Sequence, residues 1–231
     1  MRKILYIFLL LLICTNVKAF DESVLVEQNS IQSRIDNLGN KILNSNSLSK
    51  RVVFVYDDVS KKNMIKECDT LTKRQVVVYK DDYKYIASDD ELAAYLSREI
   101  PAAIRSYDGI ASGWLSSAKI KAAPKKYELV FDKFAVDYMV KAGYNPLGLI
   151  TFINKSCPQA RQDAVSTKNL TSKRLAHIYE YIYMKYPYFL ENNTYQTNEH
   201  YQNFLLTSQK NRQMLSDKIR SNNLKKTLKY E

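Results

Sequence analysis

The segment SDDELAAYLSREIPAAIRSYDG, residues 88 to 109, constrains the fold more than any other part of the chain. Ser88 and Glu91 stand three residues apart ahead of an apolar sequence. This is the spacing of a capping box, so a helix is predicted to begin at Ser88. Pro101 lies inside this helix, where it cannot donate an amide hydrogen to Ser97 and its ring crowds that carbonyl. The cost is about 3 kcal/mol unless the helix kinks, so we expect a kink that misaims the side chains after it.

A helix and two strands are predicted ahead of this segment. Between Ser30 and Leu43 apolar residues recur at three- and four-residue steps, as on one face of a helix: Ile31, Ile35, Leu38 and Ile42. The runs RVVFVY at 51–56 and QVVVY at 75–79 are β-branched and aromatic and are bounded by polar segments. Both are therefore predicted to be strands of a small sheet.

Further helices are predicted after it. Pro124 and Gly143 bound a helix from about 125 to 142. Glu128 and Asp132 project together from one face of this helix, and the residues expected in its buried stripe are Phe131, Phe134, Tyr138 and Ala142. A helix over 171–186 is predicted to turn Leu175, Ile178 and Ile182 inward. A final helix is expected around 201–220.

The first nineteen residues have the pattern of a secretory signal peptide. Arg2 and Lys3 precede an apolar run of about eleven residues, which is short of the ~20 that an uncleaved membrane anchor needs. With cleavage after Ala19, the exported chain keeps 32 basic and 24 acidic residues, a net charge of about +8. Such a charge favours anionic membrane surfaces, cell-wall polymers or nucleic acid. Two cysteines remain, Cys68 and Cys157, and an even number in an exported protein permits one disulfide.

Several motifs follow one another in a recognisable order. After the helix and strand near the start come Asn63 and a second strand, then DELAAYL at 90–96. ELVFD at 128–132 and AVDYMVKAGYNP at 135–146 follow, and STKN at 166–169 precedes Arg174-Leu175. Over roughly residues 27 to 187, this order resembles the HtpX and BepA type of zinc endopeptidase, the metallopeptidase family numbered forty-eight. The middle motifs are the most specific part of the resemblance.

The resemblance assigns a position to each member of a zinc site. Arg98 and Ala102 stand where the family has its two metal-binding histidines, and Glu128 stands where it has the third ligand. Glu99 occupies the place of the general base, and Asp132 that of the carboxylate that steadies the first histidine. Because a helical zinc site needs two imidazoles one turn apart, no catalytic metal and no cofactor are expected here. A further family histidine is replaced as well, by Lys168.

Few other residues of the chain could supply ligands to replace the missing histidines. The chain has only two histidines, His177 on a late helix and His200 in the polar tail. We interpret His177 as structural or surface-exposed. Cys68 and Cys157 could supply thiolates, but their positions do not resemble ligand spacing, and a disulfide suits an exported protein better.

The surviving carboxylates need some other cation. One hypothesis is that the guanidinium of Arg98 replaces zinc among Glu99, Glu128 and Asp132, since clustered carboxylates in a semi-buried cleft repel one another. The alternative is that Arg98 extends to solvent and the acids are simply exposed. Both remain open from the sequence.

The sequence predicts a mainly α-helical α+β protein, and the resemblance implies a gluzincin-type metallopeptidase fold with a small sheet packed on the active-site helices. The expected organisation is a signal peptide at 1–19, a metallopeptidase-like domain at 20–187 and a polar, basic helical tail at 188–231. The expected function is that of a periplasmic or secreted pseudopeptidase, which binds or regulates an unknown protein or peptide partner in the cell envelope. The alternatives are an active zinc metalloendopeptidase with an unconventional site, and a protein whose basic surface binds polyanions. No specific nucleic acid is expected.

Overall fold

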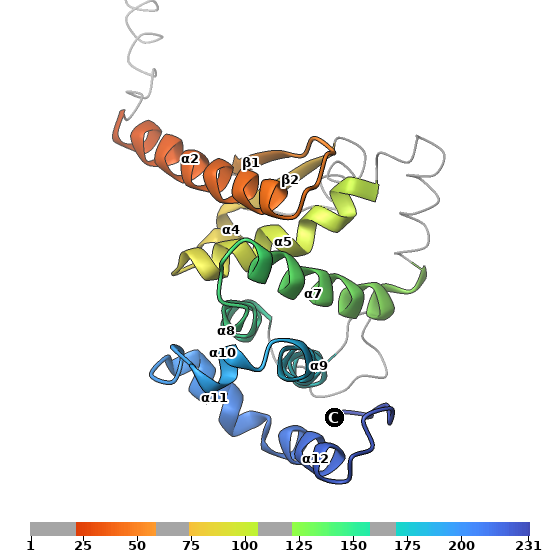
Figure 1. The fold of residues 1–231 in the computed structure, drawn as a ribbon. Coiled ribbons are helices and arrows are strands. Elements are labelled where there is room, and N and C mark those ends of the chain that lie inside the picture. The colour runs from red at the N-terminus through yellow and green to blue at the C-terminus, as the bar shows by residue number, and fades with distance from the viewer. Residues whose placement is uncertain (1–21, 59–73, 106–121, 158–169) are drawn as a thin grey trace, which may run out of the picture.

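The computed structural model describes residues 22–58, 74–105, 122–157 and 170–231 (Figure 1). These residues form an α+β structure that is mainly helical, with a small parallel sheet, as the sequence predicts at this coarse level. The elements lie in successive layers. Helix α2 lies against the sheet, α5 and α7 cross beneath them, α8 and α9 follow, and α11 and α12 lie at the far end (Figure 1). No helix in these ranges is both long and apolar enough to cross a membrane.

Helix α2 (Glu22–Ser45) packs on strand β1 (Val53–Asp57), which pairs in parallel with β2 (Gln75–Tyr79). The first strand was predicted to begin at Arg51, but its pairing with β2 starts at Val53. The side chain of Gln32 on α2 occupies the outer edge of β1. Its Nε2 donates to the carbonyl of Phe54 at 3.0 Å, and its Oε1 accepts from the amide of Tyr56 at 2.6 Å. Helix and strand are therefore joined by polar contacts as well as by packing.

Helix α5 (Asp89–Arg105) is the central element and packs against α2, α7 and α8. Its start has the capping signal seen in the sequence, because the amide of Glu91 donates to Ser88 Oγ at 3.2 Å. The Glu91 carboxylate reaches back one residue further than a standard capping box and accepts from the amide of Ala87 at 2.7 Å. Pro101 lies inside α5 and does not end it, since the helix continues to Arg105.

Helix α7 (Pro124–Lys141) begins and ends close to the predicted bounds. Gly143 follows it with φ of +79°, and the amides of Gly143 and Tyr144 donate to the carbonyls of Val140 and Met139 at 3.0 and 2.9 Å. This is a Schellman motif, in which the residue at the Gly143 position must be left-handed.

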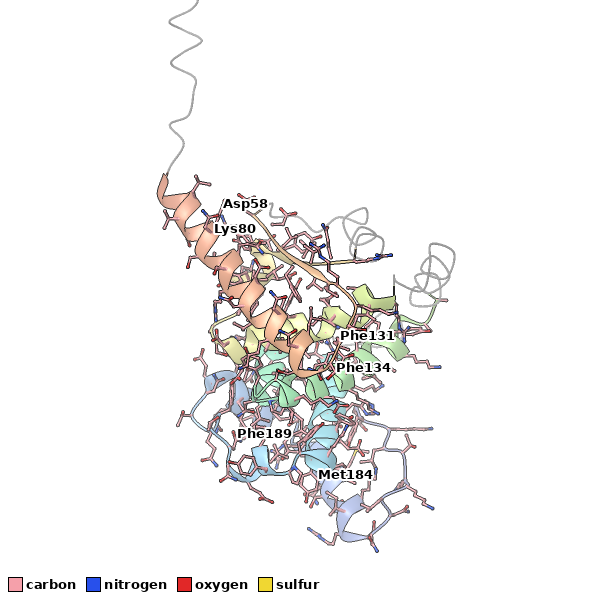
Figure 2. The ribbon with its side chains drawn as sticks, turned by 45° about the horizontal axis from the view of Figure 1, so that its top comes forward. Asp58, Lys80, Phe131, Phe134, Met184 and Phe189 are labelled. Atoms are coloured by element: carbon pink, nitrogen blue, oxygen red, sulfur yellow. The ribbon has the colours of Figure 1, made fainter. Side chains whose placement is uncertain are left out.

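The buried stripe of α7 differs from the predicted one. Phe134 is 39% exposed and Tyr138 is only half-buried; Phe134 and its neighbour Phe131 are labelled in Figure 2. Phe131 and Ala142 are buried as predicted. Ala135, Val136 and Met139, which were not predicted, are fully buried, and Asp132 lies on the same side at 1% exposed. The prediction for Phe134 was wrong because α7 has apolar residues on more than one face, and the smaller side chains face the core.

Helix α8 (Leu147–Ser156) was not predicted, although its residues from Leu147 to Ile153 are all buried. It is tied to α5 by a buried carboxylate. Glu91 accepts hydrogen bonds from Thr151 Oγ1 at 2.8 Å and from Lys155 Nζ at 2.6 Å. The capping residue of α5 therefore also holds the neighbouring helix.

Helix α9 (Thr171–Lys185) turns Leu175, Ile178 and Ile182 inward, as predicted. The final helix is in fact two, α11 (Glu199–Thr207) and α12 (Gln209–Arg220), which break at Ser208. Short helices α4 (Lys80–Tyr83) and α10 (Tyr188–Glu191) complete the described elements. The predicted tail packs on the body of the protein, because Tyr201 and Phe204 belong to the main apolar core.

Candidate functional site

Five charged side chains come together where three helices meet. Arg98 and Glu99 are on α5, Glu128 and Asp132 are on α7, and Arg174 is on α9. Helix α7 packs against both of the others, so it contributes the acids between two arginines. We call these five residues the charged cluster.

Arg174 and Asp132 form the centre of the charged cluster. Arg174 Nε lies 2.6 Å from Asp132 Oδ2, and Arg174 Nη2 lies 2.7 Å from Asp132 Oδ1. The two side chains are 4% and 2% exposed. This is the two-point geometry in which a guanidinium binds a carboxylate most strongly, and here it is closed to solvent.

Arg98 approaches the same carboxylate from α5. Its Nε donates to Asp132 Oδ1 at 2.8 Å, and its Nη1 lies 3.9 Å from Glu99 Oε1. The Arg98 side chain is 20% exposed and that of Glu99 is 29% exposed, so this edge of the charged cluster reaches solvent. Arg98 thus contacts two of the three acids that the hypothesis assigned to it.

The third acid, Glu128, is in contact with Arg174 instead. Its Oε1 lies 3.3 Å from Arg174 Nη1, and its side chain is 11% exposed. Burial by itself lowers the pKa of Arg174, but the charge and hydrogen bonds of Asp132, together with Glu128, raise it above its ordinary value. Arg174 is therefore a permanent cation inside the protein.

The charged cluster does not fit a catalytic zinc ion. Such a site needs imidazole nitrogens, whereas Arg98 carries a cation without a free lone pair and Ala102 carries only a buried methyl group. The carboxylates of Glu128 and Asp132 are in contact with Arg174. Over the ranges that the structure describes, no group of three or more His, Cys, Asp or Glu could hold a metal ion.

Of the remaining candidate residues, the two histidines pair with other acids, and Cys157 contacts the edge of the charged cluster. His177 Nδ1 is 4.0 Å from Glu180 Oε2, and His200 Nε2 is 3.2 Å from Glu199 Oε1. Cys157 Sγ accepts a weak contact from Arg174 Nη1 at 3.7 Å. Lys168 and Cys68 lie outside the described residues, so the disulfide between Cys68 and Cys157 stays a prediction.

Sequence reasoning overlooked Arg174 as a member of the charged cluster, although it appeared in the resemblance. A signal was present, because Arg174 stands four residues before Ile178 and eight before Ile182, on the inward stripe of α9. An arginine on a buried helix face needs an anionic partner, and only the packing of α7 on α9 identifies it. Comparison with known protein families, with curated proteins and with solved structures found no match for this chain.

Proposed function

We propose that this protein is a pseudopeptidase: a gluzincin-type scaffold that is exported to the cell envelope and binds or regulates a protein or peptide without hydrolysing it. One observation carries the proposal. The carboxylate at the steadying position, Asp132, accepts hydrogen bonds from two guanidinium groups, and Glu128 at the third-ligand position lies against Arg174.

The chemistry of these cations supports the loss of catalysis. A zinc ion lowers the pKa of its bound water and gives up a coordination position to the substrate. A guanidinium can neutralise the same carboxylates, but it has no open coordination position and cannot activate water. Glu99, at the position of the general base, lies beside Arg98 rather than beside a site for activated water. The scaffold keeps its charge balance and has lost its hydrolytic group.

Metal content and hydrolysis test the proposal together. Elemental analysis of the purified protein should find no stoichiometric zinc, and casein should remain intact with or without a chelator. Glu99→Gln should leave both results unchanged. Stoichiometric zinc together with casein cleavage that both the chelator and Glu99→Gln abolish would show an active metalloendopeptidase and overturn the proposal.

Export is tested separately. If the leader is removed after Ala19, the first residue of the protein recovered from the envelope or medium is Phe20. Recovery of an uncleaved chain from the cytoplasm would contradict this part of the proposal and leave the chemistry of the charged cluster untouched.

A further inference from the structure

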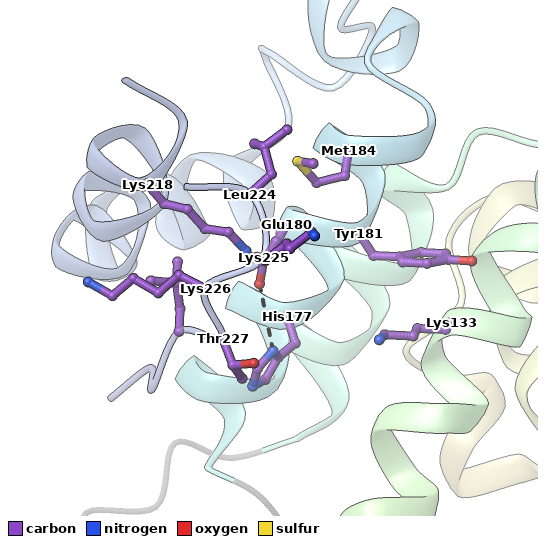
Figure 3. Close-up of a pocket in the computed structure, with 11 residues that line it drawn as sticks. Lys133, His177, Glu180, Tyr181, Met184, Lys218, Leu224, Lys225, Lys226 and Thr227 are labelled. Atoms are coloured by element: carbon purple, nitrogen blue, oxygen red, sulfur yellow. Dashed lines mark hydrogen bonds and ion pairs between the residues drawn. The ribbon is translucent and has the colours of Figure 1, made fainter. Parts of the chain in front are cut away.

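A basic pocket lies next to the charged cluster. It is lined by Lys133, which follows Asp132 on α7, and by His177, which stands three residues after Arg174 on α9. It has a volume of about 330 Å³ and is formed by α7, α9, α12 and the segment after α12 (Figure 3). Cavities that bind small molecules start at about this size. Its polar and charged lining residues are Lys133, His177, Glu180, Tyr181, Lys218, Lys225, Lys226 and Thr227; the apolar ones are Met184, Leu224 and Leu228.

The one acid of this lining is already paired. Glu180 Oε1 accepts from Lys218 Nζ at 2.7 Å, and Glu180 Oε2 accepts from the hydroxyl of Tyr230 at 3.0 Å. His177 Nδ1 lies 4.0 Å from the same Oε2. Glu180 and Lys218 therefore neutralise each other and hold α12 and the following segment on α9.

Three further lysines line the pocket, and Nζ of one of them, Lys133, lies 5.5 Å from the ring centroid of Tyr181. Among the residues that the structure describes, Lys133, Lys225 and Lys226 have no carboxylate within ion-pair distance. Lys133 extends from α7 toward His177, whereas the end of Lys226 points away from the pocket (Figure 3). Positive charge thus comes from two opposite walls, α7 and the segment after α12.

The segment that supplies Lys225 is held in place. Leu228 and Tyr230 are 7% and 3% exposed and pack with Ala176 and Leu215. Asn211 fixes the residue that follows Tyr230: its Nδ2 donates to the carbonyl of Glu231 at 2.8 Å and its Oδ1 accepts from the amide at 3.0 Å. The basic wall is therefore part of the folded structure.

We propose that this pocket binds the phosphate group of a small phosphate ester. A phosphate dianion between Lys133 and Lys225 would be attracted by the ammonium groups on both walls. Lysine binds phosphate as a point charge. The hydroxyl of Thr227 offers a hydrogen-bond donor, and Leu224 and Leu228 offer apolar contact for the carbon part of the ester. The ester is either soluble or the headgroup of an anionic lipid. The inference does not depend on the proposed loss of peptidase activity.

The pKa of His177 can report the binding of phosphate. Burial lowers its pKa, Glu180 and Asp132 raise it, and the cations Lys133 and Lys173 lower it further, so that the net direction is downward. A phosphate bound next to Lys133 offsets these cations and raises the pKa of His177. Because the chain has only one other histidine, His200, that residue serves as an internal reference.

The experiment follows the histidine ring resonances of the purified protein by NMR as glycerol phosphate is added. We expect a saturable shift of His177, a higher pKa for it, and no change at His200. Lys133→Gln and Lys225→Gln should each weaken binding about tenfold, the loss of one charged contact. Lys229→Gln removes a charge from the same exposed segment outside the pocket and should have no effect.

The source of the phosphate is resolved in a second arm with vesicles that contain phosphatidic acid, whose headgroup is a phosphate monoester like that of glycerol phosphate. The ligand is a lipid headgroup if the protein binds the vesicles, glycerol phosphate competes with this binding, and the variants weaken it in the same order. The ligand is a free ester if the protein binds glycerol phosphate and not the vesicles. Either result supports the pocket. An unmoved His177, or equal weakening by Lys229→Gln and Lys225→Gln, overturns it, since diffuse attraction to a basic surface explains the second outcome. Zinc analysis is unaffected by any of these results.

Discussion

The guanidinium of Arg174 binds both oxygens of Asp132, with Nε 2.6 Å from Oδ2 and Nη2 2.7 Å from Oδ1, while both side chains are almost completely buried. This pair joins α9 to α7, and Arg98 adds α5 through the same carboxylate. A charged carboxylate buried between helices in this way needs a cation that the packing holds beside it. The charged cluster therefore serves the fold and, under the proposed function, stands in place of a metal.

Arg174→Met should destabilise the protein by about 3–5 kcal/mol, since it leaves Asp132 buried and charged without its main partner. Urea unfolding at neutral pH measures the loss. The double variant Arg174→Met with Asp132→Asn should lose less than the sum of the two single variants, because the second change removes the unpaired charge. Additive losses would contradict the pairing.

Arg98→Met should cost less, about 1–2 kcal/mol, because Arg98 makes one hydrogen bond to Asp132 and is partly exposed. The matched control is Arg105→Met on the same helix, whose guanidinium lies 5.0 Å from the ring centroid of Tyr127. Its loss should be smaller still. A melting temperature of Arg98→Met that is unaltered across neutral pH would favour an arginine that merely extends to solvent.

At two glycines, asparagine and alanine should differ in opposite directions in how much stability they cost. A Cβ at Gly148 would lie 2.7 Å from the Cβ of Asp90 and 2.9 Å from its carbonyl carbon, so Gly148→Ala should cost about 1–3 kcal/mol and Gly148→Asn more. Gly143 has open space and a φ of +79°, so Gly143→Asn should be milder than Gly143→Ala, because asparagine tolerates this conformation. Thermal unfolding of the four variants measures whether alanine or asparagine is the more destabilising at each position. If the same residue is the more destabilising at both positions, the explanation is wrong.

Alkaline pH should destabilise the protein through buried phenols. Burial, with a smaller effect of Tyr179, raises the pKa of Tyr201 to about 12, so the folded state keeps its proton after the unfolded state has lost it. The contribution of Tyr201 to stability is complete below pH of about 10 and falls as the pH rises to about 12. Tyr201→Phe should flatten this decline in unfolding experiments. Tyr188→Phe, at a residue 64% exposed, should not.

The Tyr201→Phe variant should still lose some stability as the pH rises, because other tyrosines are buried as well. Burial also raises the pKa of Tyr95, Tyr195 and Tyr230, the last two next to Asp90 and Glu180. A decline in stability that Tyr201→Phe leaves fully unchanged would show that the Tyr201 hydroxyl is not buried.

The sequence by itself determined where several elements begin and end. Ser88 and Glu91 predicted the start of α5, and Pro124 and Gly143 predicted the limits of α7. These signals are local: a cap, a missing amide hydrogen and a left-handed residue act within one or two turns of chain, so they can be recognised without knowledge of the fold. The inward face of α9 was equally clear from its periodicity.

Only the tertiary structure decided which faces and partners those helices take. The predicted stripe of α7 was Phe131, Phe134, Tyr138 and Ala142. Packing buries the first and last of these, but it also turns Asp132 and Ala135 inward and leaves Phe134 exposed. The same packing brought Arg174 to Asp132 across forty-two positions of the chain. A charged side chain can be buried only where an oppositely charged partner faces it. The packing of α5, α7 and α9 decides which partner that is, and no stretch of neighbouring residues shows it.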